Sequence, residues 1–232
     1  IKKIKKYACD IFLSMSFDQI FLEKFYKLPP FGTINIHAGK LPFYRGRNVL
    51  NWVLINDEEE FGITAHFIDN GIDTGDIIHQ KTFPISDLDT YQTLLERAYN
   101  ECANVLIESL TKLVEGTASR VIQKNISNQF IYCVKREEGD EIINWHQSSR
   151  EIFNFIRALT KPGPGATSYL NGKEIKIYSA LLEKEAVNYK GIPGSIIGKD
   201  ENHILVKTLD SFLIIKEWNY DGNLSIGMRL KK

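Results

Sequence analysis

The chain has few cysteines, no excess of either charge and no long apolar run, and each shortage excludes a class of protein. It holds three cysteines in 232 residues. They form no CxxC pair, so neither a disulfide framework nor a zinc site is indicated, and a reducing cytoplasm is the expected location. No apolar run approaches the roughly 18–20 residues of a membrane span, so we expect no membrane partner.

Charge is balanced, with 29 basic and 29 acidic residues, so the chain lacks the basic surplus that is typical of nucleic-acid-binding proteins. We therefore expect no nucleic-acid partner. Phosphate-binding signatures are also missing, because no GxGxxG follows a strand pattern and there is no P-loop. With 43% apolar and 25% charged residues, the composition is that of an ordered globular protein.

What the sequence does contain is an alternation of strand and helix patterns over residues 1–125. Strand patterns at 33–37, 62–68 and 77–83 precede a helix pattern at 90–115. Strands that alternate with helices are typical of an α/β layer. We therefore expect residues 1–125 to form an α/β domain.

The character of the chain changes in its second half. A helix pattern at 149–159 is followed by short strand patterns separated by glycine and proline. This arrangement is typical of a small, mostly-β, barrel-like domain. We therefore expect residues 126–232 to form a second domain, made of a helix and a barrel-like sheet.

Two short segments carry residues suited to chemistry. In the first, Ile34-Asn35-Ile36-His37, strand alternation places Asn35 and His37 on one face. In the second, the Gly- and Asp-rich loop at 69–76 holds Asp73 near a strand end. An amide can donate to a developing oxyanion, an imidazole can move a proton, and a carboxylate can hold the imidazolium. Asn35, His37 and Asp73 are therefore candidate catalytic residues for acyl transfer.

Each of these residues also has a plain structural interpretation. Asn35 and His37 could be polar strand residues bonded within the core. Asp73 could be a turn residue, although Asp69 and Asp76 suit that role better. The acidic loop lacks the carboxylate spacing of a calcium site, and no histidine or cysteine spacing fits zinc, so no metal is expected. The amide, imidazole and carboxylate together favour the catalytic interpretation.

The segment 43–48 directly follows the strand motif and carries two arginines, an asparagine and two aromatic residues. Guanidinium groups grip phosphate oxygens in pairs, so this loop suits a phosphorylated or sugar-bearing ligand. The alternatives are a solvated loop, or arginines that anchor the loop to acidic neighbours. Its position beside His37 favours ligand binding, and the candidate residues are Tyr44, Arg45, Arg47 and Asn48.

These residues together resemble the signature of the 10-formyltetrahydrofolate-dependent formyltransferase family. The matching motifs are Asn35-Ile36-His37, Leu41-Pro42, Tyr44-Arg45-Gly46 and Asp73-Thr74-Gly75-Asp76. Within the family, the run from Lys40 to Asn48 and the pair Asn51-Trp52 are most similar to sugar-nucleotide N-formyltransferases. The stretch 84–102 is similar to those acting on dTDP-4-amino-4,6-dideoxyglucose. The resemblance adds Lys40 and Trp52 to the candidate substrate-binding residues.

The resemblance implies a fold and an assembly. The expected fold is a Rossmann-like formyltransferase core followed by the barrel-like domain. The family's first strands and helices have no counterpart here, and the chain begins with Ile1, so we expect an N-terminal part of the natural protein to be missing from the sequence. A cytoplasmic homodimer is also implied.

The resemblance further implies a reaction. A formyl group would pass from 10-formyltetrahydrofolate to the amine of a dTDP-linked aminosugar used for surface polysaccharide. Asn35 and His37 would stabilise the oxyanion, while Asp73 would hold His37 and help to take the amine proton. The folate-binding residues implied are Met15, Ser16, Phe17, Ile34, Asp69, Asn70 and Gly71.

Two other functions stay open. A methionyl-tRNA formyltransferase shares the Asn-His-Asp set, but it needs a basic surface for the RNA backbone, which the balanced charge disfavours. A folate- or nucleotide-sugar-binding module without catalysis is the second alternative. The presence of Asn35, His37 and Asp73 together argues against it.

Overall fold

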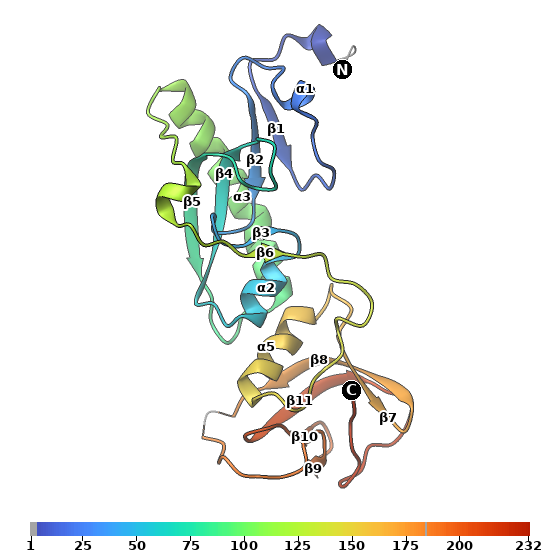
Figure 1. The fold of residues 1–232 in the computed structure, drawn as a ribbon. Coiled ribbons are helices and arrows are strands. Elements are labelled where there is room, and N and C mark those ends of the chain that lie inside the picture. The colour runs from blue at the N-terminus through green and yellow to red at the C-terminus, as the bar shows by residue number, and fades with distance from the viewer. Residues whose placement is uncertain (1–3, 184) are drawn as a thin grey trace. The chain divides into compact units, whose positions relative to one another are not determined.

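The structure is a computed structural model that describes residues 4–183 and 185–232, and it divides into two compact units (Figure 1). Two short stretches of the N-terminal half group with the second unit. The first unit comprises Ile1–Leu50, Glu59–Ser86 and Leu95–Lys135, and the second comprises Asn51–Glu58, Asp87–Leu94 and Arg136–Lys232. The predicted single boundary at residue 125 stays a prediction. Among the described residues, no helix is both long and apolar enough to cross a membrane.

A four-stranded mixed sheet is the centre of the first unit. Its strands are β1 (Phe12–Met15), β2 (Thr33–His37), β4 (Glu60–Phe67) and β5 (Ile77–Pro84), and they lie in the order β1-β2-β4-β5. β1 runs parallel to β2, whereas β2–β4 and β4–β5 are antiparallel pairs. The predicted strand at 33–37 is confirmed residue for residue, because apolar and polar side chains alternate strictly along it.

The long helix α3 (Tyr91–Val114) confirms the helix predicted at 90–115 to within one residue at each end. Its buried positions Ala98, Cys102, Val105 and Ser109 recur every three or four residues, which is the spacing of one helix face. The remaining elements of this half are short. They are the 3-10 helix Ile4–Tyr7, α1 (Glu23–Tyr26), β3 (Arg45–Gly46) and α2 (Val49–Ile55).

The segment after α3 holds two further short elements, α4 (Gln123–Ile126) and β6 (Tyr132–Cys133). β6 pairs in parallel with β3, because the backbone N–H groups of Arg45 and Arg47 donate to the carbonyls of Ile131 and Cys133 at 2.9 and 2.8 Å. The segment therefore lies against the loop that follows β2.

The second unit is built from one helix and one sheet. The helix α5 (Ser149–Leu159) begins with a capping box, in which Ser148 and Glu151 each bond the other's backbone N–H. An antiparallel sheet follows in the order β7-β8-β11-β10-β9. Its strands are β7 (Ala166–Leu170), β8 (Lys173–Leu181), β9 (Ile196–Lys199), β10 (Ile204–Lys207) and β11 (Phe212–Asn219).

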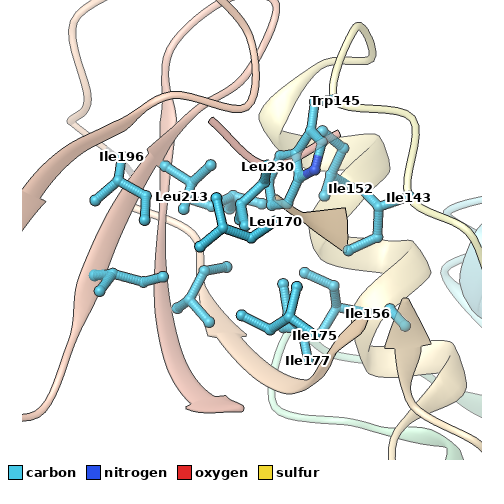
Figure 2. Packing of buried hydrophobic residues seen from close by; sticks show 14 of the residues in the cluster. Ile143, Trp145, Ile152, Ile156, Leu170, Ile175, Ile177, Ile196, Leu213 and Leu230 are labelled. Atoms are coloured by element: carbon cyan, nitrogen blue, oxygen red, sulfur yellow. The ribbon is translucent and has the colours of Figure 1, made fainter. Parts of the chain in front are cut away.

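The core of this unit lies between α5 and the sheet. Figure 2 shows Ile156 of α5 beside Ile175 and Ile177 of β8, and all three side chains are fully or almost fully buried. Ile152 lies one turn earlier on the same helix face and is also fully buried. The buried residues recur every four positions on the helix and every two positions on the strand, as one face of each element requires.

The sheet of the second unit is open, and its two edges are bridged by the C-terminal segment. Tyr169 of β7 forms an isolated bridge with Lys231, and Ser195, next to β9, forms one with Arg229. No regular ladder joins the edge strands β7 and β9 in the described part of the chain. The expected barrel-like domain is therefore an antiparallel sheet with bridged edges rather than a closed barrel.

Candidate active site

The structure brings the three predicted catalytic residues together around a fourth, His66. His37 Nδ1 lies 3.6 Å from Asp73 Oδ2, and His66 Nε2 lies 3.4 Å from Asp73 Oδ1. The amide nitrogen of Asn35 lies 3.3 Å from His66 Nε2. Asp73 therefore lies between the two imidazoles, and Asn35 reaches Asp73 through His66.

His66 was missed by sequence reasoning, although a signal for it exists. In the antiparallel pair of β2 and β4, Asn35 is directly opposite His66 and His37 is opposite Thr64. Directly opposed residues on one face of a sheet have their side chains in contact. Thr64 and His66 repeat the alternation of Asn35 and His37, but which strand pairs with which, and in what register, is decided only by folding.

Other residues of the loop that carries Asp73 determine its shape. The Asp69 carboxylate accepts hydrogen bonds from the N–H of Gly71 at 3.0 Å and from the hydroxyl of Thr74 at 2.5 Å, so Asp69 is the turn residue, as predicted. A side chain on Gly75 would place its Cβ 1.8 Å from the carbonyl oxygen of Phe67, so only glycine fits there. Asp73 itself has a φ of 53°, in the left-handed region.

The environment of Asp73 keeps its carboxylate ionised. Burial would raise the pKa of Asp73, but the hydrogen bond with His66, the charge of His37 and the N–H of Gly46 at 2.9 Å outweigh burial. The pKa of Asp73 therefore falls to about 2. A carboxylate with so low a pKa is a weak base and a strong partner for a cation.

The surroundings of His37, in contrast, favour its uncharged form. Burial lowers the pKa of His37 below its ordinary value, against the opposing effects of the Asp73 charge and the Tyr44 carbonyl. Its Nε2 lies 2.7 Å from the Tyr44 carbonyl oxygen, which can only accept, so this nitrogen carries the ring proton. Nδ1 is then the nitrogen that can take a second proton, and the resulting imidazolium would face Asp73 on one side and Tyr44 on the other.

A pocket of about 530 Å³ opens beside this cluster and contains Asn35, His37, His66 and Asp73 in its wall. Of the residues predicted to bind folate, Met15, Ser16, Phe17, Asp69 and Gly71 line it. Ile34 is fully buried and does not line the pocket, and its predicted contact with folate stays a prediction. Asn70 lines a separate cavity, whose wall also includes Asp69.

The pocket also has lining residues that sequence reasoning did not find. Phe21, Tyr132 and Lys135 belong to its wall, together with the buried thiols of Cys102 and Cys133. Burial raises the pKa of Cys102 to about 11 and that of Cys133 to about 12, so neither is a nucleophile near neutral pH. No group of three or more histidine, cysteine, aspartate or glutamate side chains among the described residues could hold a metal ion.

Of the two arginines predicted to grip a ligand, only Arg47 lines the pocket. It is exposed, and its guanidinium donates to the backbone carbonyl of Asp18. The prediction for Arg45 needs correction, because its side chain is buried, donates twice to Gln123 Oε1 and lies over the ring of Phe130. Arg45 thus anchors the loop, as the alternative held, but to the amide of Gln123 rather than to an acidic neighbour.

Tyr44 is also corrected, because its side chain is buried and its contact with the cluster is made by its carbonyl oxygen. Lys40 forms an ion pair with Glu60, away from the pocket wall. Asn48 is exposed and immediately precedes α2. Trp52 lies on α2, in a stretch that belongs to the second unit, and its predicted role stays a prediction.

Comparison with known proteins identifies the class that this fold and site define. Two family models match the chain, Formyl transferase over residues 1–110 and Formyl transferase, C-terminal domain, over residues 135–229. The methionyl-tRNA formyltransferase of Pelotomaculum thermopropionicum is 34% identical over 220 residues, which is 94% of this chain and 68% of that protein. The chain therefore belongs to the formyltransferase family and is an enzyme of formyl transfer.

Solved structures confirm the fold class. WlaRD, a sugar 3N-formyl transferase crystallised with dTDP and 5-N-formyl-THF, matches with a TM-score of 0.69 at 30% identity, over 90% of this chain and 72% of its own. The N-formyltransferase from Helicobacter canadensis, in complex with folinic acid and dTDP-3-aminofucose, matches with a TM-score of 0.69 at 29% identity, over 90% and 73%. Both structures thus contain a folate and a dTDP group.

Proposed function

We propose that this chain transfers the formyl group of 10-formyltetrahydrofolate to the amine of a nucleotide-linked dideoxy aminosugar, with dTDP-4-amino-4,6-dideoxyglucose as the first candidate. The observation that carries this proposal is the likeness, over 90% of the chain, to two N-formyltransferases whose structures hold a dTDP group. The pocket supports it, because its wall contains the cations Arg47 and Lys135 and the rings of Phe17 and Tyr132, and this combination suits phosphates and aromatic rings.

In the proposed reaction, the neutral amine of the acceptor attacks the formyl carbon and forms a tetrahedral oxyanion. Asn35 has one amide N–H directed at His66 and a second that can donate to this oxyanion. Removal of one such donor typically costs ~10²–10³ in rate. Asn35 is therefore assigned the stabilisation of the oxyanion.

The amine must lose a proton as the new C–N bond forms, and the folate N10 must gain one as its bond to the formyl carbon breaks. We assign the proton transfer to His37 Nδ1, because the low pKa of Asp73 makes that carboxylate a weak base. Asp73, 3.6 Å away, stabilises the imidazolium until the proton passes to N10. The proton count is then balanced and no covalent enzyme intermediate is required.

The folate is proposed to lie along the end of β1 and the acidic loop. Met15, Ser16 and Phe17 line the pocket, and so do Asp69 and Gly71. A pocket with an aromatic side chain in its wall fits a flat pterin ring. We also propose a cytoplasmic location and a homodimeric assembly, both from the resemblance, and light scattering at micromolar concentration tests the second.

A methionyl-tRNA formyltransferase is the second candidate, favoured by the 34% identity to the Pelotomaculum enzyme. A tRNA acceptor needs phosphate contacts over a wide basic surface, and its binding falls steeply with salt. The chain carries equal numbers of basic and acidic residues, which is why we rank the sugar acceptor first.

The two candidates are separated by one acceptor assay. The purified protein is incubated with 10-formyltetrahydrofolate and either a panel of nucleotide-linked aminosugars or methionyl-tRNA, and formylated products are measured by mass spectrometry. We expect a mass gain on one aminosugar and none on the tRNA. Formylation of the tRNA alone would overturn the sugar assignment, and turnover of neither would favour the binding-module alternative.

A further inference from the structure

Gln123, the first residue of α4, is buried against the catalytic loop although it lies outside every motif singled out in the sequence. A side-chain amide offers two N–H donors and two oxygen lone pairs. Gln123 Nε2 donates to the carbonyls of Asp73 and Gly75, each at 2.8 Å. Its Oε1 accepts from Arg45 Nη2 at 2.6 Å and Nε at 3.1 Å. The full bonding capacity of the amide is therefore used.

These bonds belong to a closed network that holds both the backbone and the side chain of Asp73. Gln123 binds the backbone carbonyl of Asp73, while the N–H of Gly46, next to Arg45, binds its carboxylate at 2.9 Å. Asp73 has a φ of 53°, which a residue with a side chain adopts only when its surroundings hold it there. The hydrogen-bond network supplies that restraint. Gln123 and Gly46 hold the loop from neighbouring segments, and Asp69 bonds residues within the loop itself.

Further contacts join Arg45 to the segment that follows Gln123. The guanidinium of Arg45 lies 4.8 Å from the ring centre of Phe130, and the backbone of Arg45 bonds the carbonyl of Ile131. The segment that carries Gln123 therefore contacts both the loop that holds Arg45 and the loop that holds Asp73.

We propose that Gln123 is a positioning residue for formyl transfer, which clamps the Asp73 loop to the Arg45 loop so that the Asp73 carboxylate faces His37. It acts through Asp73 and does not touch substrate. The proposal rests on the roles assigned above to Asp73 and His37. Asp73 is faced by His37 from β2, by His66 from β4 and by Gly46 from β3, and Gln123 of α4 holds its backbone carbonyl.

The chemistry of the amide makes specific substitutions informative. Gln123→Glu keeps an oxygen for Arg45 and forms an ion pair with it, but it loses both donors and sets a carboxylate against two carbonyl oxygens. Gln123→Met keeps the length of the side chain and loses all four bonds. Combining it with Arg45→Met avoids a buried guanidinium without a partner, which would itself destabilise the fold.

The first test needs no acceptor substrate. The pKa of His37 is measured by NMR titration of the histidine side chains, with the His37 signal assigned by its loss in His37→Gln. Because the charge of Asp73 favours the protonated ring, we expect the double variant Arg45→Met/Gln123→Met to show a His37 pKa about 0.5–1 unit below that of the wild type. Equal pKa values in the double variant and the wild type would overturn the proposal, whichever acceptor the enzyme uses.

The second test separates positioning from stability. For Gln123→Glu, kcat with 10-formyltetrahydrofolate and an acceptor used by the wild type should fall about tenfold or more at a temperature where the variant is fully folded, with KM values within about threefold. The matched control Gln129→Glu adds the same charge at an exposed site of the same segment and should behave as wild type. A wild-type kcat in Gln123→Glu, or a melting temperature lowered while kcat is retained, would show that Gln123 only stabilises the fold.

Discussion

His37 Nδ1 lies 3.6 Å from Asp73 Oδ2, and this relationship links the electrostatics of the site to its chemistry. The distance is longer than a hydrogen bond, so the neutral ring and the carboxylate are adjacent without being bonded. Burial favours the neutral form of His37, while Asp73 favours the protonated form. The ring is therefore suited to be unprotonated before the reaction and to be stabilised once it takes a proton.

Replacing Asp73 by asparagine should remove the stabilisation of that imidazolium and leave the shape of the loop. We expect kcat to fall by ~10²–10⁴-fold, the usual range for general acid–base groups, with a smaller change in KM. The measurement is steady-state formyl transfer alongside thermal melting. An Asp73→Asn variant that retains a fifth or more of wild-type kcat would show that the carboxylate is not needed.

Stability should fall as the pH falls below about 6.5, because of His37. The unfolded ring binds a proton near its ordinary pKa, whereas burial lowers the pKa of the folded ring, so the unfolded state binds more protons in this range. Each such group changes the free energy of unfolding by up to ~1.4 kcal/mol per pH unit. Melting temperatures at pH 7, 6 and 5 should show a shallower decline for His37→Gln than for wild type.

The exposed residue His146 provides the control, and His146→Gln should keep the wild-type slope. Asp73 affects the stability of the fold in a separate, more acidic range of pH. Its lowered pKa stabilises the folded state above pH 4, and that contribution is lost as the pH falls from about 4 towards 2. Identical slopes for His37→Gln and wild type between pH 7 and 5 would contradict the assignment.

His66 should act on the reaction through Asn35. His66→Leu removes the group that lies against the Asn35 amide and one of the two imidazoles beside Asp73, so we expect kcat to fall by about tenfold. His66→Gln, which can still bond that amide, should recover part of the loss. In a double-mutant cycle, adding His66→Leu to Asn35→Ala should cost much less than it costs alone. Full additivity would refute the coupling between the two residues.

The two arginines of the loop should separate into a binding residue and a structural one. Arg47→Ala removes a charge from the pocket wall, so KM for the acceptor should rise by roughly ten- to a hundredfold while melting is unchanged. Arg45→Ala removes two bonds to Gln123 and the contact with Phe130, and it should destabilise the fold by about 1.5–3 kcal/mol.

Both variants are assayed for KM of folate and acceptor and for melting temperature. The folate KM should barely move in Arg47→Ala, since the residues proposed to bind folate lie along β1 and the acidic loop. If Arg47→Ala changes the folate and acceptor constants equally, its assignment to the acceptor fails.

Local sequence patterns were sufficient for much of the fold. The strand at 33–37 and the helix at 149–159 were predicted with their observed bounds, because alternation and helical spacing reflect which side chains a single element buries. The same local reasoning named Asp69 and Asp76 as turn candidates, and the carboxylate of Asp69 does bond groups within five residues. The set of Asn35, His37 and Asp73 also followed from residue type and motif.

Only the tertiary structure decided which residues complete that set. His66 joins it through the register of β2 and β4, and Gln123 through bonds to residues about fifty and eighty positions earlier in the chain. Arg45 and Arg47 look equivalent in the sequence, yet one is buried and the other lines the pocket. Partners that are distant along the chain leave no periodic signal, because their contact depends on the packing of whole elements rather than on the pattern of any one of them.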